Sequence, residues 1–353
     1  MHISMVFCEK IAIFAPDKPT YVINMKNICT LLLSVILVAA SITACSSAKR
    51  GSSDPSEQSA TDSTATAAIL FCADSAFSYV KAQCDFGPRV PGTDAHRRCG
   101  DYLAAHMEAC GANVINQRTT LTTFDGTRLP ARNIIAEFAP DSSRRILLLA
   151  HWDCRPWADS DPDPDRRKEP VMGANDAASG VAVLMELARV FAVEAPPVGV
   201  DLLLVDAEDW GTSNNEESWA LGTQYWVKNP HRKGYRPQFG ILLDMVGAAG
   251  AQFAKEYFSM AYAPSVISDV WTAALKSGYG NYFVASRGGG VTDDHIFVNA
   301  AGIPCIDIID YRTDAESGFF PGWHTTADTP DCIDPSTLKA VGQTLVNFIY
   351  NQY

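Results

Sequence analysis

This sequence of 353 residues has few basic side chains: it contains 28 Lys and Arg but 40 Asp and Glu. The formal net charge of -12 leaves no basic surface for the phosphates of nucleic acid. We therefore expect no nucleic-acid partner, and acidic substrates are disfavoured for the same reason.

Cysteine pairs with the spacing of a structural zinc site are also missing, since no two cysteines are separated by two residues. If a metal is bound, carboxylate oxygen and imidazole nitrogen must be its ligands. Seven cysteines follow Cys45. This number is odd, so at least one thiol stays free even if disulfides form in an oxidising envelope.

An apolar segment long enough to span a membrane is lacking as well. The apolar segment after Met25 and Lys26 covers residues 28–40 and is shorter than the roughly 20 residues of a membrane helix. It leads to Ile-Thr-Ala before Cys45, which resembles a bacterial lipobox. We predict a lipoprotein signal peptide over residues 25–44 and lipidation of the Cys45 thiol. A plain signal peptide or a single membrane anchor is the alternative.

The predicted signal peptide sets the expected boundaries of the other segments of the chain. We expect translation to start at Met25, so that residues 1–24 are not part of the protein. Residues 45–67 are rich in Ser, Ala and Thr and are typical of a flexible tether. A single catalytic domain is expected over residues 68–353. We expect a monomer in the cell envelope, held by its lipid at the outer membrane and facing the periplasm.

The hydrophobic pattern of the domain predicts its fold class. Helices are expected at residues 68–86 and 92–110, followed by two strands at 114–124 and 132–138. Continuous apolar runs then alternate with amphipathic helices. Such runs are typical of strands buried on both faces. We therefore predict a three-layer α/β/α domain with a mostly parallel mixed sheet, with strands at 146–150, 200–205, 239–243 and 303–309 and helices at 180–193, 219–228, 265–277 and 336–350.

Polar residues follow the predicted strands at the edge where function is expected in such a sheet. Asp176 lies in a loop of small residues that enters a helix, and two histidines occur later in the chain. Several carboxylates that converge on one edge repel each other unless a cation or a proton lies among them. Mixed imidazole and carboxylate ligands suit a catalytic zinc ion. The residues concerned are His151, Asp153, Asp176, Glu208, Asp209, Asp244, His295 and His324.

These residues, in this order, resemble the M28 metallopeptidase superfamily. The set comprises His-Trp-Asp at 151–153, Gly-Ala-Asn-Asp at 173–176, Glu-Asp at 208–209, Asp-Asp-His at 293–295 and Trp-His at 323–324. More narrowly it resembles the glutaminyl-peptide cyclotransferase branch. The resemblance covers the chain from about residue 68 to its C-terminus.

The resemblance implies a role for each matching position. One zinc ion would be bound by Asp176, Asp209 and His324, with Glu208 as general acid and base. Asp244 and Asp293 would form a carboxyl pair that shares a proton. Trp323 would line an apolar pocket for the glutamine side chain, and the outer positions around the metal would be filled by His151 and His295.

Two positions depart from the pattern of the animal cyclases. The acidic ligand after Glu208 is Asp209 rather than Glu, and Asn214 occupies a position that carries Trp in those enzymes. Trp210 or Trp219 is expected to replace the missing pocket wall.

The implied reaction converts the N-terminal glutamine of peptides or proteins into pyroglutamate and releases ammonia. The alternative is an aminopeptidase with two zinc ions, in which His151 and Asp244 bind the second metal. A second alternative is an inactive lipoprotein that binds peptides. The acidic loop 159–165 lacks the ligand spacing of an EF-hand, so we expect it to be a solvated loop near the entrance of the site.

Overall fold

The computed structural model describes residues 69–312, 315 and 317–352. The predicted signal peptide, the lipidation of Cys45 and the tether lie outside these residues. Across the described residues, no helix combines the length and the hydrophobicity needed to cross a membrane.

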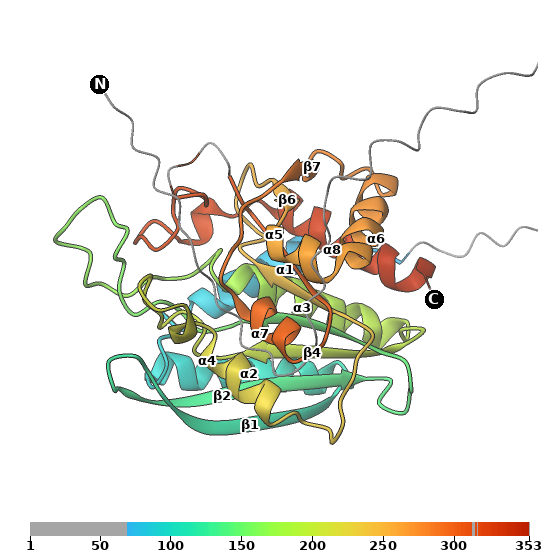
Figure 1. Cartoon of the computed structure of the whole chain (residues 1–353), viewed down its shortest axis with the longest axis horizontal. Coiled ribbons are helices and arrows are strands. Elements are labelled where there is room, and N and C mark those ends of the chain that lie inside the picture. The colour runs from blue at the N-terminus through green and yellow to red at the C-terminus, as the bar shows by residue number, and fades with distance from the viewer. Residues whose placement is uncertain (1–68, 313–314, 316, 353) are drawn as a thin grey trace, which may run out of the picture. The chain divides into compact units, whose positions relative to one another are not determined.

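A six-stranded sheet forms the centre of the domain (Figure 1). Its strand order is β1-β2-β4-β3-β5-β8. The first three strands in this order pair antiparallel, and β4, β3, β5 and β8 pair parallel. The strands are β1 (Asn113–Thr122), β2 (Arg128–Phe138), β3 (Arg145–His151), β4 (Gly199–Val205), β5 (Gly240–Asp244) and β8 (Cys305–Ile309).

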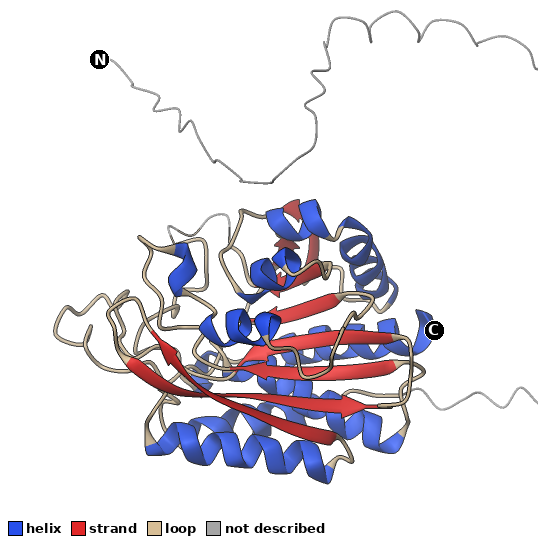
Figure 2. Ribbon diagram, turned by 60° about the horizontal axis from the view of Figure 1, so that its bottom comes forward, coloured by secondary structure: helices blue, strands red, loops and turns tan. Residues whose placement is uncertain are grey.

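Helices cover both faces of this sheet, as Figure 2 shows. One face carries α1 (Ala73–Cys84), α2 (Asp94–Ala109), α3 (Ala178–Val193), α6 (Pro264–Lys276) and α8 (Pro335–Gln352), which share a large apolar core with the sheet. The other face carries α4 (Leu221–Lys228) and α7 (Asp294–Ala300) over a smaller core. Shorter elements complete the domain: α5 (Tyr257–Tyr262), a second, parallel pair of β6 (Phe253–Lys255) and β7 (Phe283–Arg287), and two 3-10 turns, η1 (Glu216–Ser218) and η2 (Pro330–Cys332).

Alternation along the strands explains why their sequences are continuously apolar. In β3, Leu148 belongs to the large core, whereas Leu147 and Leu149 belong to the small core on the opposite face. Both kinds of side chain are therefore removed from water. The predicted three-layer fold is confirmed, and the four apolar runs form β3, β4, β5 and β8.

The sequence patterns did not reveal every element. Helices α5 and α7 and the strand β6 were not predicted, because each is too short to show a hydrophobic period. Strand β7 was missed because only its first residue is buried, so it has no apolar run. The sequence allows disulfides, but the seven cysteines of the described chain, from Cys72 to Cys332, are all free thiols.

The parallel arrangement brings three chain segments to one place. Strands β3, β4 and β5 lie side by side in the same direction, so the residues after their carboxyl ends meet at one edge of the sheet. Gly180 in the first turn of α3 packs directly against the end of β5, where an added Cβ would overlap the backbone oxygen of Leu243.

This close contact yields a test of the packing. Alanine normally stabilises a helix relative to glycine, yet we expect Gly180→Ala to lower the free energy of unfolding by about 1–3 kcal/mol because backbone atoms must move apart. Urea unfolding followed by circular dichroism measures this change. Gly280→Ala is the matched control, since its Cβ would meet only the end of the Leu275 side chain. Unchanged or increased stability of Gly180→Ala would contradict the packing described.

Candidate metal centre

Three side chains at the sheet edge form a compact group of potential metal ligands. Asp176 comes from the loop before α3, Asp209 from the segment after β4, and His324 from the loop between β8 and α8. His324 Nε2 lies 3.2 Å from an Asp209 oxygen and 3.7 Å from an Asp176 oxygen. All three are at most 5% exposed. Two carboxylates and one imidazole that converge in this way fit three protein ligands of a catalytic zinc ion, which leaves one position open.

A second group shares Asp176 with the first. His151 Nε2 lies 3.0 Å from an Asp176 oxygen and 3.3 Å from an Asp244 oxygen, and ligand atoms of these three residues lie within 4.8 Å of one another. His151 is therefore in direct contact with a predicted ligand. The arrangement of ligands allows one metal ion or two, as the sequence had already implied.

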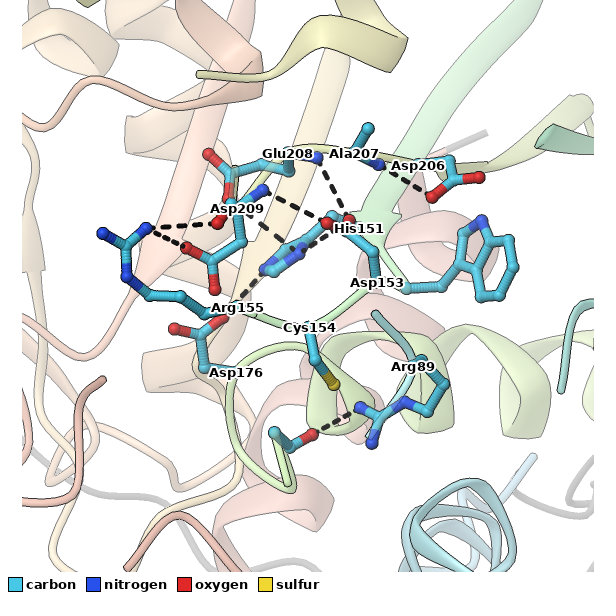
Figure 3. Close-up of polar contacts among 12 residues, drawn as sticks. Arg89, His151, Asp153, Cys154, Arg155, Asp176, Asp206, Ala207, Glu208 and Asp209 are labelled. Carbon is cyan, nitrogen blue, oxygen red and sulfur yellow. Dashed lines mark hydrogen bonds and ion pairs between the residues drawn. The ribbon is translucent and has the colours of Figure 1, made fainter. Parts of the chain in front are cut away.

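The loop after β4 is fixed by a carboxylate that belongs to the strand-end motif. Asp153 accepts hydrogen bonds from the backbone N–H groups of Glu208, at 3.1 Å, and of Asp209, at 3.2 Å. Figure 3 shows the His151 ring between Asp153 and Asp176. Asp153 thus sets where the predicted acid/base and the predicted ligand lie.

Arg155 also supports the centre, and the sequence did not reveal it. Its guanidinium donates to the backbone and side-chain oxygens of Asp209, at 3.1 and 3.2 Å (Figure 3). It also donates to both oxygens of Asp159, at 2.7 and 2.6 Å. An Asp159 oxygen in turn lies 3.7 Å from Nδ1 of His324. The one signal in the sequence is the spacing of four residues between Arg155 and Asp159.

Part of the acidic loop 159–165 therefore faces inward. Besides Asp159, the buried Asp161 accepts hydrogen bonds from the backbone N–H and the hydroxyl of Thr326, at 2.9 and 2.5 Å. The rest of the loop is exposed, as expected, but these two carboxylates contact the segment that carries His324.

Burial changes the protonation of the carboxyl groups beside the ligands. It raises the pKa of Glu208 well above its usual range, and the nearby Asp293 adds to the rise. Burial also raises the pKa of Asp293 well above its usual range, with the charge of Asp244 as the next cause. For Asp244, burial and the charge of Asp176 raise the pKa. These three groups are suited to holding and exchanging protons.

A cavity of about 260 Å³ opens beside these groups. One part of its wall consists of Glu208, Asp244 and Asp293, and apolar side chains, including Trp219, Trp323 and Phe319, form another part. The Trp323 ring lies 3.8 Å from that of His324, nearly parallel to it. A cavity of acids, aromatic rings and potential ligands suits a small polar group on an apolar stem.

The remaining predicted residues lie further from the cavity. Trp210 is not among the described residues that line it, and its ring contacts Trp157 edge-on at 5.6 Å. His295 is buried in α7, where Nε2 lies 3.2 Å from Glu256 and Nδ1 lies 3.9 Å from Asp307. Asp293, by contrast, lines the cavity and caps the N-terminus of the same helix.

Comparisons with known proteins agree with this architecture. The profile of peptidase family M28 matches residues 133–349. A glutaminyl cyclase of Bacteroides thetaiotaomicron, solved with N-acetylhistamine, is 52% identical, with 80% of this chain and 99% of that chain covered and a TM-score of 0.79. A Zn-dependent exopeptidase of Parabacteroides distasonis is 49% identical, with coverage of 80% and 100% and a TM-score of 0.79. A structure named as a leucine aminopeptidase precursor, also from B. thetaiotaomicron, is 52% identical, with coverage of 80% and 98% and a TM-score of 0.78.

The raised pKa values predict how the metal-free protein responds to pH. Glu208 and Asp293 bind protons more tightly in the folded than in the unfolded chain. The free energy of unfolding should therefore fall as the pH rises from about 4, the ordinary carboxyl pKa, through the raised values. Each group contributes at most about 1.4 kcal/mol per pH unit. His151, whose pKa is also raised, adds a fall in the same direction at higher pH.

Urea unfolding of chelator-treated protein at a series of pH values measures this slope. Glu208→Gln should flatten it, because one of the responsible groups is removed. A metal-free protein whose stability increases between about pH 5 and about pH 8 would contradict the charge arrangement described.

Proposed function

This chain belongs to peptidase family M28, within its glutaminyl cyclase branch, and we propose that it is a zinc-dependent glutaminyl-peptide cyclotransferase. It converts the N-terminal glutamine of peptides or proteins into pyroglutamate and releases ammonia. The observation that carries the proposal is the cavity wall, where Glu208 lies beside the buried pair Asp244 and Asp293, with Trp219 and Trp323 also at the cavity.

Asp176, Asp209 and His324 are the proposed ligands of a single zinc ion. Bound there, zinc supplies a Lewis acid that polarises the side-chain amide carbonyl of the substrate glutamine. The carboxylate-rich ligand set supports this assignment, because it needs a cation to offset its charge.

Glu208 moves the proton that the reaction transfers. The α-amine nitrogen of the substrate attacks its own side-chain amide carbon, and a new C–N bond forms. The bond from that carbon to the amide nitrogen then breaks. One proton passes from the α-amine to Glu208 and from Glu208 to the departing nitrogen, which leaves as ammonia. The raised pKa of Glu208 suits both transfers.

The other cavity residues hold the substrate and exclude water. Trp219 and Trp323 provide apolar surface for the methylene groups of glutamine. Raised pKa values let Asp244 and Asp293 hold protons, so that these groups can donate and accept hydrogen bonds to the reacting groups. Cyclisation consumes no water, so substrate side chains that displace water from the cavity would favour it over hydrolysis.

A dizinc aminopeptidase is the second candidate function. The contact of His151 with both Asp176 and Asp244 favours it, since these three residues would bind the second metal. A peptide-binding protein without activity is the third. The described site keeps both the proposed ligands and Glu208, which a binding protein would not need.

The proposed location of the enzyme rests on residues 25–45. A lipid on Cys45 would hold it in the cell envelope, at the outer membrane facing the periplasm, where peptide N-termini can reach the site as substrates. We propose that it acts as a monomer.

Two peptides distinguish the enzymatic candidates. The protein is incubated with one peptide that begins with Gln and one that begins with Leu, and the products are measured by mass spectrometry. We expect loss of ammonia from the first peptide and no change in the second. Release of free leucine without pyroglutamate, together with two zinc ions per chain, would establish the aminopeptidase instead.

The role of Glu208 gives a sharper prediction. Glu208→Gln should lower kcat by about 100- to 10,000-fold, because the amide cannot carry the proton. Zinc content, measured by atomic absorption, should stay as in the wild type. Glu217→Gln is the matched control, since Glu217 is exposed on the turn that follows. Full activity of Glu208→Gln would show that Glu208 does not transfer the proton.

A further inference from the structure

A buried carboxylate outside the motifs reaches the loop that carries Asp176. Asp328 lies four residues after His324 and is fully buried. Its two oxygens accept hydrogen bonds from the backbone N–H groups of Asn175, at 2.7 Å, and of Asp176, at 3.1 Å. The thiol of Cys332 lies 3.5 Å from one of these oxygens as a further donor. Asp328 is therefore surrounded by donors and bound to two successive residues of the ligand loop.

The same geometry occurs at the other acidic ligand. Asp153 binds the successive N–H groups of Glu208 and Asp209 through its two oxygens, as Asp328 binds those of Asn175 and Asp176. In both cases the carboxylate comes from a different segment of the chain. In both cases the second of the two N–H groups belongs to a proposed zinc ligand.

The segment that carries Asp328 is itself anchored. The backbone oxygen of Asp328 accepts a hydrogen bond from the N–H of Ala174, at 3.3 Å. Thr326 is held by Asp161, and the backbone oxygen of His324 accepts from Ser160 at 3.1 Å. One short segment thus presents the ligand His324 and also holds the backbone of the ligand Asp176.

We propose that Asp328 is a positioning residue that keeps Asp176 in the geometry zinc requires. The inference rests on the proposed zinc site. Asp176 and Asp209 repel each other before the metal binds, so the loop of Asp176 must be held by contacts other than the metal. Hydrogen bonds from two adjacent N–H groups to the two oxygens of one carboxyl group fix both the position and the direction of that loop. Asp328 acts through Asp176 and touches no substrate.

Asp328→Asn tests the proposal in the whole chain. An asparagine side chain offers one acceptor oxygen and turns its NH₂ group toward the other backbone N–H, so one of the two hydrogen bonds is lost. We expect zinc affinity, measured by competition with a chelator, to fall about 10- to 100-fold. The absorption spectrum of the cobalt-substituted protein should change as well. Asp331→Asn, an exposed position three residues further on, is the matched control and should keep wild-type affinity.

The unfolding of zinc-free protein separates positioning from a general structural role. Wild-type zinc affinity and an unchanged cobalt spectrum in Asp328→Asn, with a loss of stability alone, would overturn the proposal. If that variant does not fold, Asp328→Ser provides the test, because it removes the carboxylate without an opposing amide. Wild-type zinc affinity in Asp328→Ser would equally overturn it. Zinc binding is measured without substrate, so a failure of the proposed cyclase reaction would not be mistaken for a failure of this inference.

Discussion

Concentrated negative charge inside the protein is the constraint on which the arrangement of the site depends. Five carboxyl groups meet at the carboxyl edge of the sheet, and each is at most 7% exposed. Adjacent carboxylates removed from water cannot all stay ionised without cations or protons among them. A metal ion would satisfy part of this demand, and the raised pKa values of Glu208 and Asp293 favour bound protons as another part. The groups are Asp176, Glu208, Asp209, Asp244 and Asp293.

The fold must also hold these carboxyl groups together against their mutual repulsion. The strands β3, β4 and β5 are buried on both faces, so the segments that leave them start from fixed positions. Hydrogen bonds then restrain these segments. Arg155 donates to the oxygens of Asp209, and Asp153 accepts from the backbone N–H groups of Glu208 and Asp209. The ligands therefore stay together because the surrounding protein holds them, which is what a preformed metal site requires.

The sequence was sufficient for the fold class, and the structure brings the predicted ligands together. Apolar runs reveal buried strands, and a carboxylate or imidazole after each run can be assigned to one edge once the strands are parallel. Arg155, Asp159 and Asp328 could not be found in this way. Arg155 and Asp159 show only a spacing of four residues, which does not reveal their contacts with Asp209 and His324. Asp328 bonds to backbone groups far away in the chain and leaves no spacing pattern. The choice between Trp210 and Trp219 needed the fold as well, because both lie in one loop and only the path of that loop decides which ring reaches the cavity.

The same charge constraint bears on our proposal of a single zinc ion. A second zinc ion at His151, Asp176 and Asp244 needs Asp244 ionised, whereas burial and the neighbouring carboxylates raise its pKa. The charge of Asp244 in turn raises the pKa of Asp293, so a proton and a second zinc ion would compete for this pair of carboxyl groups. A hydrolase gains from the second metal because it must generate a nucleophile from water. Cyclisation uses the substrate's own amine, and a shared proton at Asp244 and Asp293 is then more useful than another cation. We therefore propose that Asp293 favours one metal ion at a site whose ligands could bind two.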